Sequence, residues 1–340
     1  TGTGKTNAYL LPILQDHVFS TQRHPRVLIL VPTRELVLQV VENVKQLSQY
    51  LSVRVMGVYG GVNIKTQKLA VADGCDVLVA TPGRLYDLVL SRAIQLKELK
   101  KLVIDEVDVM LDLGFRPQLT NLFELMPNKR QSIMFSATMT DEVSMLIDDF
   151  FMRPVRVNIA LSGTPLDNIA QRCYPARNFN TKANLLKFLL EDKQVFKKVL
   201  VFVQSKKHAD RLFGLIDPAY PGQTSVIHAN KTQNYRIRAI EDFDSGKHRI
   251  LIATDLMARG LDLSLISHVL SFDVPIFPEN YMHRIGRTGR AKEEGNALLF
   301  YTQAELSAKA GIEALMDMKI PELAFPDEVE VSGQLIPDEQ

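Results

Sequence analysis

Residues 26–36 read RVLILVPTREL, an apolar run that stops at a proline and continues as an amphipathic stretch. A short run rich in β-branched residues and apolar at nearly every position is typical of a strand buried on both faces of a parallel sheet. Similar strands are predicted at residues 53–59, 76–80, 102–105 and 131–136, with helices at 34–51 and 83–90 among them. This alternation predicts an open α/β sheet with helical crossovers.

The pattern stops near the middle of the chain and then restarts. Residues 154–171 show no clear periodicity, and Ser-Gly-Thr-Pro at 162–165 is a cluster of structure breakers. Beyond it, strands are predicted at 198–203, 224–228, 249–253, 267–272 and 296–301, and helices at 182–190, 208–217 and 233–244. We therefore expect two tandem three-layer αβα domains with open parallel sheets, at 1–155 and 172–325. A linker at 156–171 would join them, and an acidic tail at 326–340 would be poorly ordered beyond residue 331.

Composition sets limits on the class of protein. The 340 residues are enough for two domains, and 46% hydrophobic with 23% charged residues is ordinary for a soluble globular chain. The formal net charge is +1, so any nucleic-acid surface must be local. Cys75 and Cys173 are expected to be separate thiols in a reducing compartment. No apolar run reaches the roughly 18 residues that suggest a membrane span.

The first six residues, TGTGKT, match the end of a phosphate-binding loop. Glycines let backbone N–H groups approach phosphate, a lysine reaches the β- and γ-phosphates, and a hydroxyl ligates Mg²⁺. The candidate residues are Thr1, Gly2, Thr3, Gly4, Lys5 and Thr6, with Thr6 as the metal ligand. The full pattern would begin upstream of Thr1, so we expect the N-terminal edge of the domain to be missing. A simple turn or helix cap is the alternative.

Carboxylates follow the apolar run at 102–104. Asp105 and Glu106 would lie at the carboxyl end of a strand, where open α/β sheets bind ligands. Asp105 is suited to hold Mg²⁺, and Glu106 to orient and deprotonate an attacking water. Alone, such a run is more often a solvated turn. Its place after a buried strand and downstream of the phosphate loop favours a catalytic pair.

Residues 283–290 read HRIGRTGR, with arginines at every third position. On one helical turn Arg284, Arg287 and Arg290 would project toward one side. Fixed guanidinium groups stabilise the charge that spreads over a transferred phosphate. The alternative is a solvated basic face or a plain phosphate binder.

Taken together and in this order, these strings resemble the DEAD-box RNA helicases. The resemblance rests on TGTGKT, PTREL at 32–36, Gly60-Gly61, TPGR at 81–84, DEVD at 105–108, SAT at 136–138 and HRIGRTGR, and extends to about residue 301. Val107 stands where the family usually has alanine. The resemblance implies two RecA-like domains and an ATP-dependent RNA helicase that uses ATP and Mg²⁺. It also implies RNA as the partner, a monomer and a cytoplasmic location, with no membrane association.

The resemblance also assigns roles to individual residues. Hydroxyls and N–H groups where strands end and helices start are suited to RNA phosphates. The RNA contacts so implied are Pro32, Thr33, Arg34, Gly61, Thr81, Pro82, Gly83, Arg84, Gln233, Arg236, Thr254 and Asp255. Those implied for the nucleotide are Gly260, Asp262, Arg287 and Arg290, the last two as arginine fingers. Those implied for coupling between the domains are Asp108, Ser136, Thr138, His283 and Arg284, with Ser136 and Thr138 bonded to Asp108.

The implied mechanism is closure of the two domains by ATP and single-stranded RNA, which separates a few base pairs, followed by reopening after hydrolysis. An ATP-gated RNA clamp would use the same residues. A DNA helicase or translocase fits PTREL and HRIGRTGR less well, and a small-molecule kinase leaves the second domain unexplained. The preference for ATP over GTP rests on the resemblance alone, because the segment that reads adenine would precede Thr1.

Overall fold

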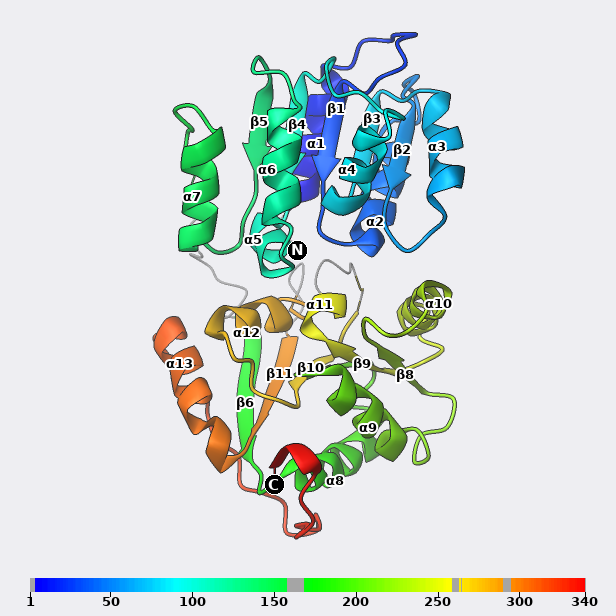
Figure 1. Ribbon diagram of the computed structural model, residues 1–340. Coiled ribbons are helices and arrows are strands. Elements are labelled where there is room, and N and C mark those ends of the chain that lie inside the picture. The colour runs from blue at the N-terminus through cyan, green and yellow to red at the C-terminus, as the bar shows by residue number, and fades with distance from the viewer. Residues whose placement is uncertain (1–3, 158–167, 259–262, 264, 290–294, 340) are drawn as a thin grey trace. The chain divides into compact units, whose positions relative to one another are not determined.

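The computed structural model describes residues 4–157, 168–258, 263, 265–289 and 295–339 (Figure 1). The chain forms two compact units, which comprise the described residues within 4–157 and within 168–339. Most of the predicted linker, residues 158–167, lies outside the described residues. No helix within the described parts combines the length and the apolar character needed to cross a membrane.

The first unit is a parallel sheet with helices on both faces, as predicted. Its strands in the described residues are β1 (Val27–Leu30), β2 (Val55–Val58), β3 (Val77–Ala80), β4 (Lys101–Ile104) and β5 (Gln131–Met134), in the order β2-β3-β1-β4-β5. Its helices there are α1 (Lys5–Gln15), α2 (Arg34–Leu47), α3 (Ile64–Ala72), α4 (Pro82–Leu90), α5 (Val107–Asp112), α6 (Arg116–Glu124) and α7 (Asp141–Phe150). Helix α2 ends four residues before the predicted end at residue 51.

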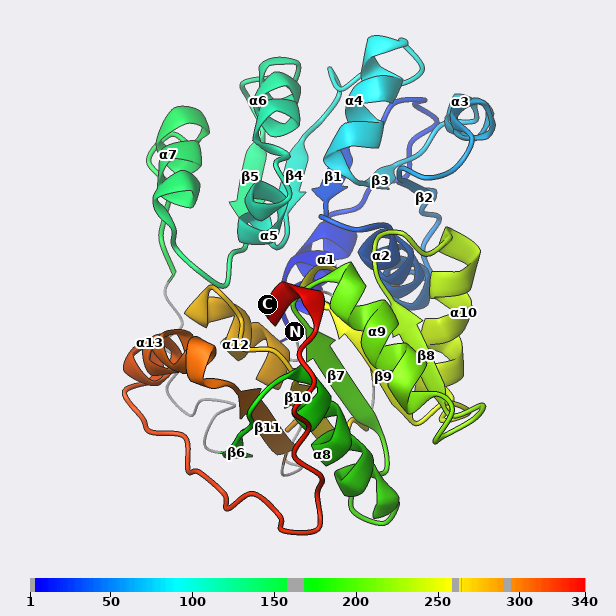
Figure 2. The ribbon, with the colours of Figure 1, turned by 60° about the horizontal axis from the view of Figure 1, so that its bottom comes forward.

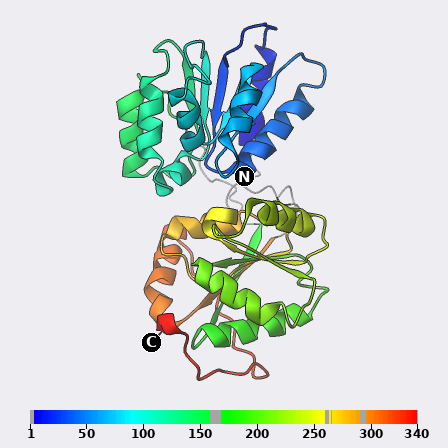
Figure 3. The same cartoon turned by 45° about the vertical axis from the view of Figure 1, so that its right-hand side comes forward.

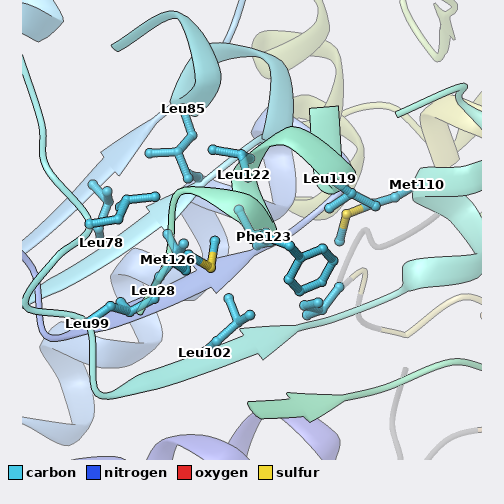
Figure 4. Close-up of a cluster of buried hydrophobic side chains, with 14 of the residues drawn as sticks. Leu28, Leu78, Leu85, Leu99, Leu102, Met110, Leu119, Leu122, Phe123 and Met126 are labelled. Carbon is cyan, nitrogen blue, oxygen red and sulfur yellow. The ribbon is translucent and has the colours of Figure 1, made fainter. Parts of the chain in front are cut away.

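Strand register explains how the core of this unit is built. Leu28 on β1 is paired with Leu78 on β3 and with Leu102 on β4, so the three side chains share one face of the sheet. Figure 4 shows them beneath Leu119, Leu122 and Phe123 of α6, and all six side chains are almost fully buried. On the other face, α1 and α2 cover the alternate residues of the same strands. Apolar side chains on both faces explain why these strands are continuous hydrophobic runs.

The second unit repeats the architecture. Its strands in the described residues are β6 (Ile169–Pro175), β7 (Val199–Val203), β8 (Thr224–Ile227), β9 (Ile250–Thr254), β10 (His268–Ser271) and β11 (Gly295–Tyr301), in the parallel order β6-β11-β10-β7-β9-β8. Its helices there are α8 (Phe179–Glu191), α9 (Lys206–Ile216), α10 (Gln233–Asp244), α11 (Asp255–Ala258), α12 (Pro278–Ile285) and α13 (Leu306–Met316), with short 3-10 turns η1 (Gln303–Glu305) and η2 (Pro337–Glu339). Figure 3 shows α8 and α9 lying together on one face.

Strand β6 was not predicted. It begins at Ile169, inside the segment predicted as linker to residue 171, and pairs in parallel with β11. Ile169, Gln171 and Cys173 are buried while the residues between them are exposed. An alternating strand at the edge of a sheet carries a weaker apolar signal than the central strands, which explains the error.

The acidic tail is ordered, contrary to expectation. Val329 and Ile336 are 6% and 2% exposed and join the core on the α8 face of the sheet. Figure 2 shows the segment, in red, running along α8. The side-chain amides of α8 and its N-cap donate to its main-chain oxygens: Asn178 to Ser332 (2.7 Å), Asn180 to Gln334 (2.8 Å) and Asn184 to Glu330 (3.0 Å). The prediction of disorder rested on the acidic composition of the tail, which gives no signal for these apolar and backbone contacts.

If the tail is part of the core, Ile336→Ala should lower the free energy of unfolding by about 2–5 kcal/mol, because it opens a cavity under a buried side chain. Urea denaturation followed by circular dichroism measures this. The neighbouring Leu335, 44% exposed, supplies the matched control, and Leu335→Ala should change stability by no more than about 0.5 kcal/mol. Equal effects of the two substitutions would contradict the docked tail.

Candidate functional site

The end of the predicted phosphate loop caps the first helix. Gly4 is the N-cap of α1 with φ 73°, in the left-handed region, and a Cβ there would meet no atom of the described residues within 4 Å. Glycine is therefore needed for the backbone conformation rather than for space. Lys5 and Thr6 lie in the first turn of α1, and the N–H groups and dipole at the start of a helix favour an anion. Thr1, Gly2 and Thr3 lie outside the described residues.

Asp105 lies directly after β4 and is 6% exposed. The Tyr9 hydroxyl, on α1, donates to Asp105 Oδ2 at 3.3 Å. Burial raises the pKa of Asp105, while the charge of Lys5 and the Tyr9 hydrogen bond oppose the rise. Burial and the nearby Asp105 carboxylate also raise the pKa of Tyr9, so it remains a neutral donor. Tyr9 was not predicted as a site residue, although its place four residues after Lys5 puts both on one side of α1.

Glu106 has an unusual backbone. As the N-cap of α5 it has φ 54° and ψ 50°, the left-handed conformation that costs a non-glycine residue roughly 1–2 kcal/mol. Such strain is concentrated at functional sites, where the surrounding structure holds it in place. The next residue, Val107, is fully buried in the core and donates its N–H to the Phe135 oxygen at 3.1 Å. The Val107 side chain therefore serves packing, and the strand ends fix the direction of Glu106.

Of the two hydrogen bonds predicted between SAT and the last aspartate of DEVD, the structure shows the one from Thr138. Thr138 Oγ1 donates to Asp108 Oδ2 at 3.1 Å. Ser136 Oγ donates to the main-chain oxygen of Thr138 at 2.5 Å, so it holds the turn that carries Thr138. Asp108 is 6% exposed on α5, and the turn after β5 is thereby tied to the helix that follows β4.

The residues after β1 and β3 start helices, as predicted. Thr33 accepts the Leu36 N–H and caps α2, and Thr81 and Pro82 start α4. The Arg34 guanidinium lies 4.4 Å from the centre of the Tyr59 ring. Its Nε and Nη1 are buried and find no hydrogen-bond acceptor among the described residues. A guanidinium that is held over a ring and still has N–H groups to donate is suited to bind an anion.

Arg84 stabilises a neighbouring turn through hydrogen bonds, in addition to supplying a positive charge. It donates to Gln67 Oε1 (2.7 Å) and to the Val62 oxygen (2.9 Å), and Gln67 donates to the Tyr59 oxygen (3.3 Å). These bonds hold the turn that contains Gly61, whose φ is 79°. Gln67 was not predicted, because a lone glutamine in a helix gives no sequence signal.

The prediction that the three arginines share one helical turn is wrong. Helix α12 ends at Ile285, so Arg287 lies beyond it, and Arg290 is outside the described residues. Arg284 and Arg287 are 1% and 3% exposed, which excludes a solvated basic face for these two. His283 lies in the last turn of α12. Gly286 and Gly289 interrupt the helical pattern that the spacing suggested.

Arg284 is bound within its own unit. Its Nε and Nη2 donate to Asp255 Oδ1 (2.6 Å) and Oδ2 (2.7 Å), and its Nη1 donates to the Asp273 oxygen (2.6 Å). Its guanidinium also lies over the Phe202 ring, 5.2 Å from the centre. Asp255, which was expected to contact RNA, is thus paired with Arg284. This bidentate pair ties α12 to the end of β9, where Thr254 lies.

Gln233 and Arg236 lie on the first turn of α10, and Arg236 donates to Gln233 Oε1. Arg236 Nη1 also contacts Met257 Sδ of α11 at 2.8 Å. The pair therefore lies next to α11, the helix that follows Thr254. Gln233, Arg236 and Thr254, all predicted to contact RNA, lie at the carboxyl ends of neighbouring strands. Gly260 and Asp262 lie outside the described residues.

A buried ionic cluster after β10 was also missed. Asp273, 4% exposed, accepts from His208 Nδ1 (2.8 Å) and the Gln204 N–H (2.8 Å), and Lys182 Nζ lies 3.8 Å away. Lys182 Nζ also lies 2.6 Å from Glu305 Oε2. Burial alone would raise the pKa of Asp273, but the His208 hydrogen bond and the nearby positive charges hold it below its usual value. The same hydrogen bond raises the pKa of His208.

Comparison with known proteins gives consistent matches over both units. The family model described as DEAD/DEAH box helicase matches residues 1–146, and the helicase conserved C-terminal domain matches residues 181–292. The structure is similar to S. cerevisiae Dbp5 bound to RNA and ADP BeF3, with 28% identity, 95% of this chain and 83% of that chain covered, and a TM-score of 0.85. It is also similar to Mss116p bound to ssRNA and AMP-PNP (26%, 96% and 70%, TM-score 0.81). A DEAD box protein from the hyperthermophile Methanococcus jannaschii is 31% identical, with coverage of 95% and 86% and a TM-score of 0.52.

The ionic cluster predicts a pH dependence of stability. Since the folded-state pKa of His208 is raised, its stabilisation is complete below the unfolded pKa of about 6.5 and is lost as pH rises through the folded value. Asp338, whose Oδ2 is 3.6 Å from His208 Nε2, and Lys182 also face this ring. Urea denaturation at several pH values above 6 should therefore show falling stability, and His208→Gln should flatten the fall. An unchanged slope in that variant would contradict this account.

Proposed function

Because the chain belongs to the DEAD-box helicase family and is an ATP-dependent RNA helicase, we propose that its first unit hydrolyses ATP through Lys5, Asp105 and Glu106. The observation that carries this assignment is the buried Asp105 carboxylate, held by Tyr9 and followed at once by the strained Glu106. Such pre-organisation of charged groups at the carboxyl end of a strand is typical of phosphoryl-transfer sites.

The first turn of α1 is proposed to bind the phosphates of ATP. Gly4, in the left-handed conformation, begins α1, and the N–H groups in the first turn of a helix have no acceptor within that helix. Lys5 adds a positive charge that already acts on Asp105. Each of these groups favours a negatively charged ligand.

Magnesium is proposed to bind Asp105 and Thr6. The residues fit such an ion, because a carboxylate whose pKa is raised by burial gains stability from a nearby cation, and carboxylate and hydroxyl oxygens are ligands of the kind Mg²⁺ prefers. When bound, Mg²⁺ neutralises charge on the phosphates. Tyr9 orients the carboxylate by holding its Oδ2 atom.

Glu106 is proposed to orient the attacking water and accept its proton. Its position as the N-cap of α5 follows from main-chain bonds at the ends of β4 and β5, including that from Val107 to Phe135. A general base must lie within hydrogen-bond reach of its proton donor. A backbone that is held in place keeps the carboxylate of Glu106 at a constant position for this purpose.

RNA is proposed to bind along the residues that follow the strands of each unit. In the first unit, Arg34 has buried donors without an acceptor in the described residues, and Thr33 and Thr81 start helices. In the second unit, Gln233, Arg236 and Thr254 lie at one edge of the sheet. The similar Dbp5 and Mss116p structures are bound to RNA. Contacts to phosphates imply weak sequence preference and affinity that falls with salt.

We also propose that the chain acts as a monomer in the cytoplasm. Both sets of helicase residues are present on one chain, and Cys75 and Cys173 are buried thiols without a disulfide, which suits a reducing compartment.

Glu106→Gln tests the catalytic assignment. It should lower RNA-stimulated ATP hydrolysis by about 10²–10⁴-fold, because the amide cannot accept the proton from water, while ATP binding changes little. Phosphate release and nucleotide affinity measure the two effects. Glu124→Gln, at an exposed position on α6, is the control and should leave both unchanged. Rapid turnover by the Glu106 variant would remove this residue from the catalytic role.

Arg287 tests the assignment of an arginine finger to the second unit. Arg287→Ala should remove much of the RNA-stimulated rate, since such a residue is worth about 10³–10⁵ in turnover, and Arg287→Lys should rescue it poorly because an ammonium lacks the planar fork. ATP affinity should fall far less than turnover. Because Arg287 is buried, circular dichroism must show that each variant folds. Near-normal turnover by folded Arg287→Ala would exclude the finger role, and Arg290 is open to the same test.

A further inference from the structure

An exposed aromatic side chain lies on the first turn of α10, beside residues assigned to RNA. Tyr235 is 41% exposed, and its N–H donates to the Thr232 cap at 3.4 Å, which fixes its place in the turn. Tyr235 precedes Arg236 in the sequence, and Arg236 contacts Met257, three residues after Thr254. The inference below rests on the proposed RNA-binding role of this edge.

The Tyr235 ring is held by its neighbours. Lys231 Nζ lies 5.7 Å from the ring centre and 2.8 Å from Asp210 Oδ1. Asp210 also accepts from His228 Nε2 at 3.0 Å. The ion pair therefore keeps the lysine against the ring, and an aromatic group that is already held loses little freedom when a ligand stacks on it.

The surroundings of the ring are basic. Lys206 and Lys207 are exposed at the start of α9, and Lys206 Nζ lies 3.5 Å from Asn230 Oδ1, one residue before Lys231. The nearby carboxylate, Asp210, has its charge shared between Lys231 and His228. Positive charge along a track, together with an exposed aromatic ring, is the combination that binds single-stranded nucleic acid without reading its sequence.

We propose that Tyr235 stacks on one unpaired base of the RNA, next to the backbone contacts of Gln233 and Arg236, while Lys206, Lys207 and Lys231 neutralise adjacent phosphates. Every base has a π-face, so this contact adds affinity without sequence preference. A base inside a duplex is already stacked on its neighbours. Tyr235 therefore favours binding of single-stranded over duplex RNA. Phosphate contacts alone discriminate less well between the two, because both carry phosphates.

Binding to two strands of equal length tests the proposal: an oligouridylate and an abasic strand with the same ribose-phosphate backbone. Tyr235→Ala in the full chain should weaken oligouridylate binding by about 5- to 100-fold and leave abasic-strand binding unchanged, and Tyr235→Phe should restore it. Tyr50→Ala is the matched control, since Tyr50 is 98% exposed on the first unit. Fluorescence anisotropy of labelled strands gives the affinities.

A direct readout is available because the sequence contains no tryptophan. Tyr235→Trp supplies a single tryptophan, whose emission, excited at a wavelength that tyrosine does not absorb, should be quenched by oligouridylate and not by the abasic strand. Equal oligouridylate affinity of Tyr235→Ala and the unchanged chain, or no quenching by a bound oligouridylate, would overturn the stacking proposal and leave the phosphate track intact. Failure of the unchanged chain to bind either strand would overturn both.

Discussion

The parallel register of the two sheets is the constraint on which the functional geometry depends. Leu30, Ala80 and Ile104 are paired across β1, β3 and β4, so these strands end at the same edge. Main-chain bonds continue one step beyond the strands: Asp105 donates to the Leu30 oxygen at 3.0 Å, and Phe135 donates to the Ile104 oxygen at 2.8 Å. The residues that leave the sheet are thus held by the ladder itself, and their side chains start from fixed positions at one edge.

Buried charges then fix the direction of the side chains. Asp105 is bonded to Tyr9, Arg284 to Asp255, and Asp273 to His208, each with at least one partner nearly or fully buried. Burying a charged pair costs desolvation free energy that offsets much of its attraction, so such a pair contributes less to stability than the attraction alone would. Their main effect is orientation, because a buried charged or polar group that moved away from its partner would lose its hydrogen bond without gaining one to water. The Asp273 cluster extends this order to the tail through Asp338.

Much of this could be predicted from the sequence because the signals are local. Alternating strands and helices, the residues at strand ends and the bond between Thr138 and Asp108 all agree with expectation. Errors arose where the pattern was weak or where tertiary contacts overrode it. An edge strand with alternate buried residues was taken for linker, an acidic tail for disorder, and the spacing of the arginines for a continuous helical turn.

The sequence by itself determined the fold class, the order of the strands along the chain and the chemistry available at each strand end, because periodicity and glycine-rich or charged strings are properties of neighbouring residues. Only the tertiary structure decided which of those side chains meet. Tyr9 reaches Asp105 across 96 positions, and Arg284 reaches Asp255 across 29. A contact between distant residues depends on strand order, register and packing together, and none of these is contained in the pattern around either residue.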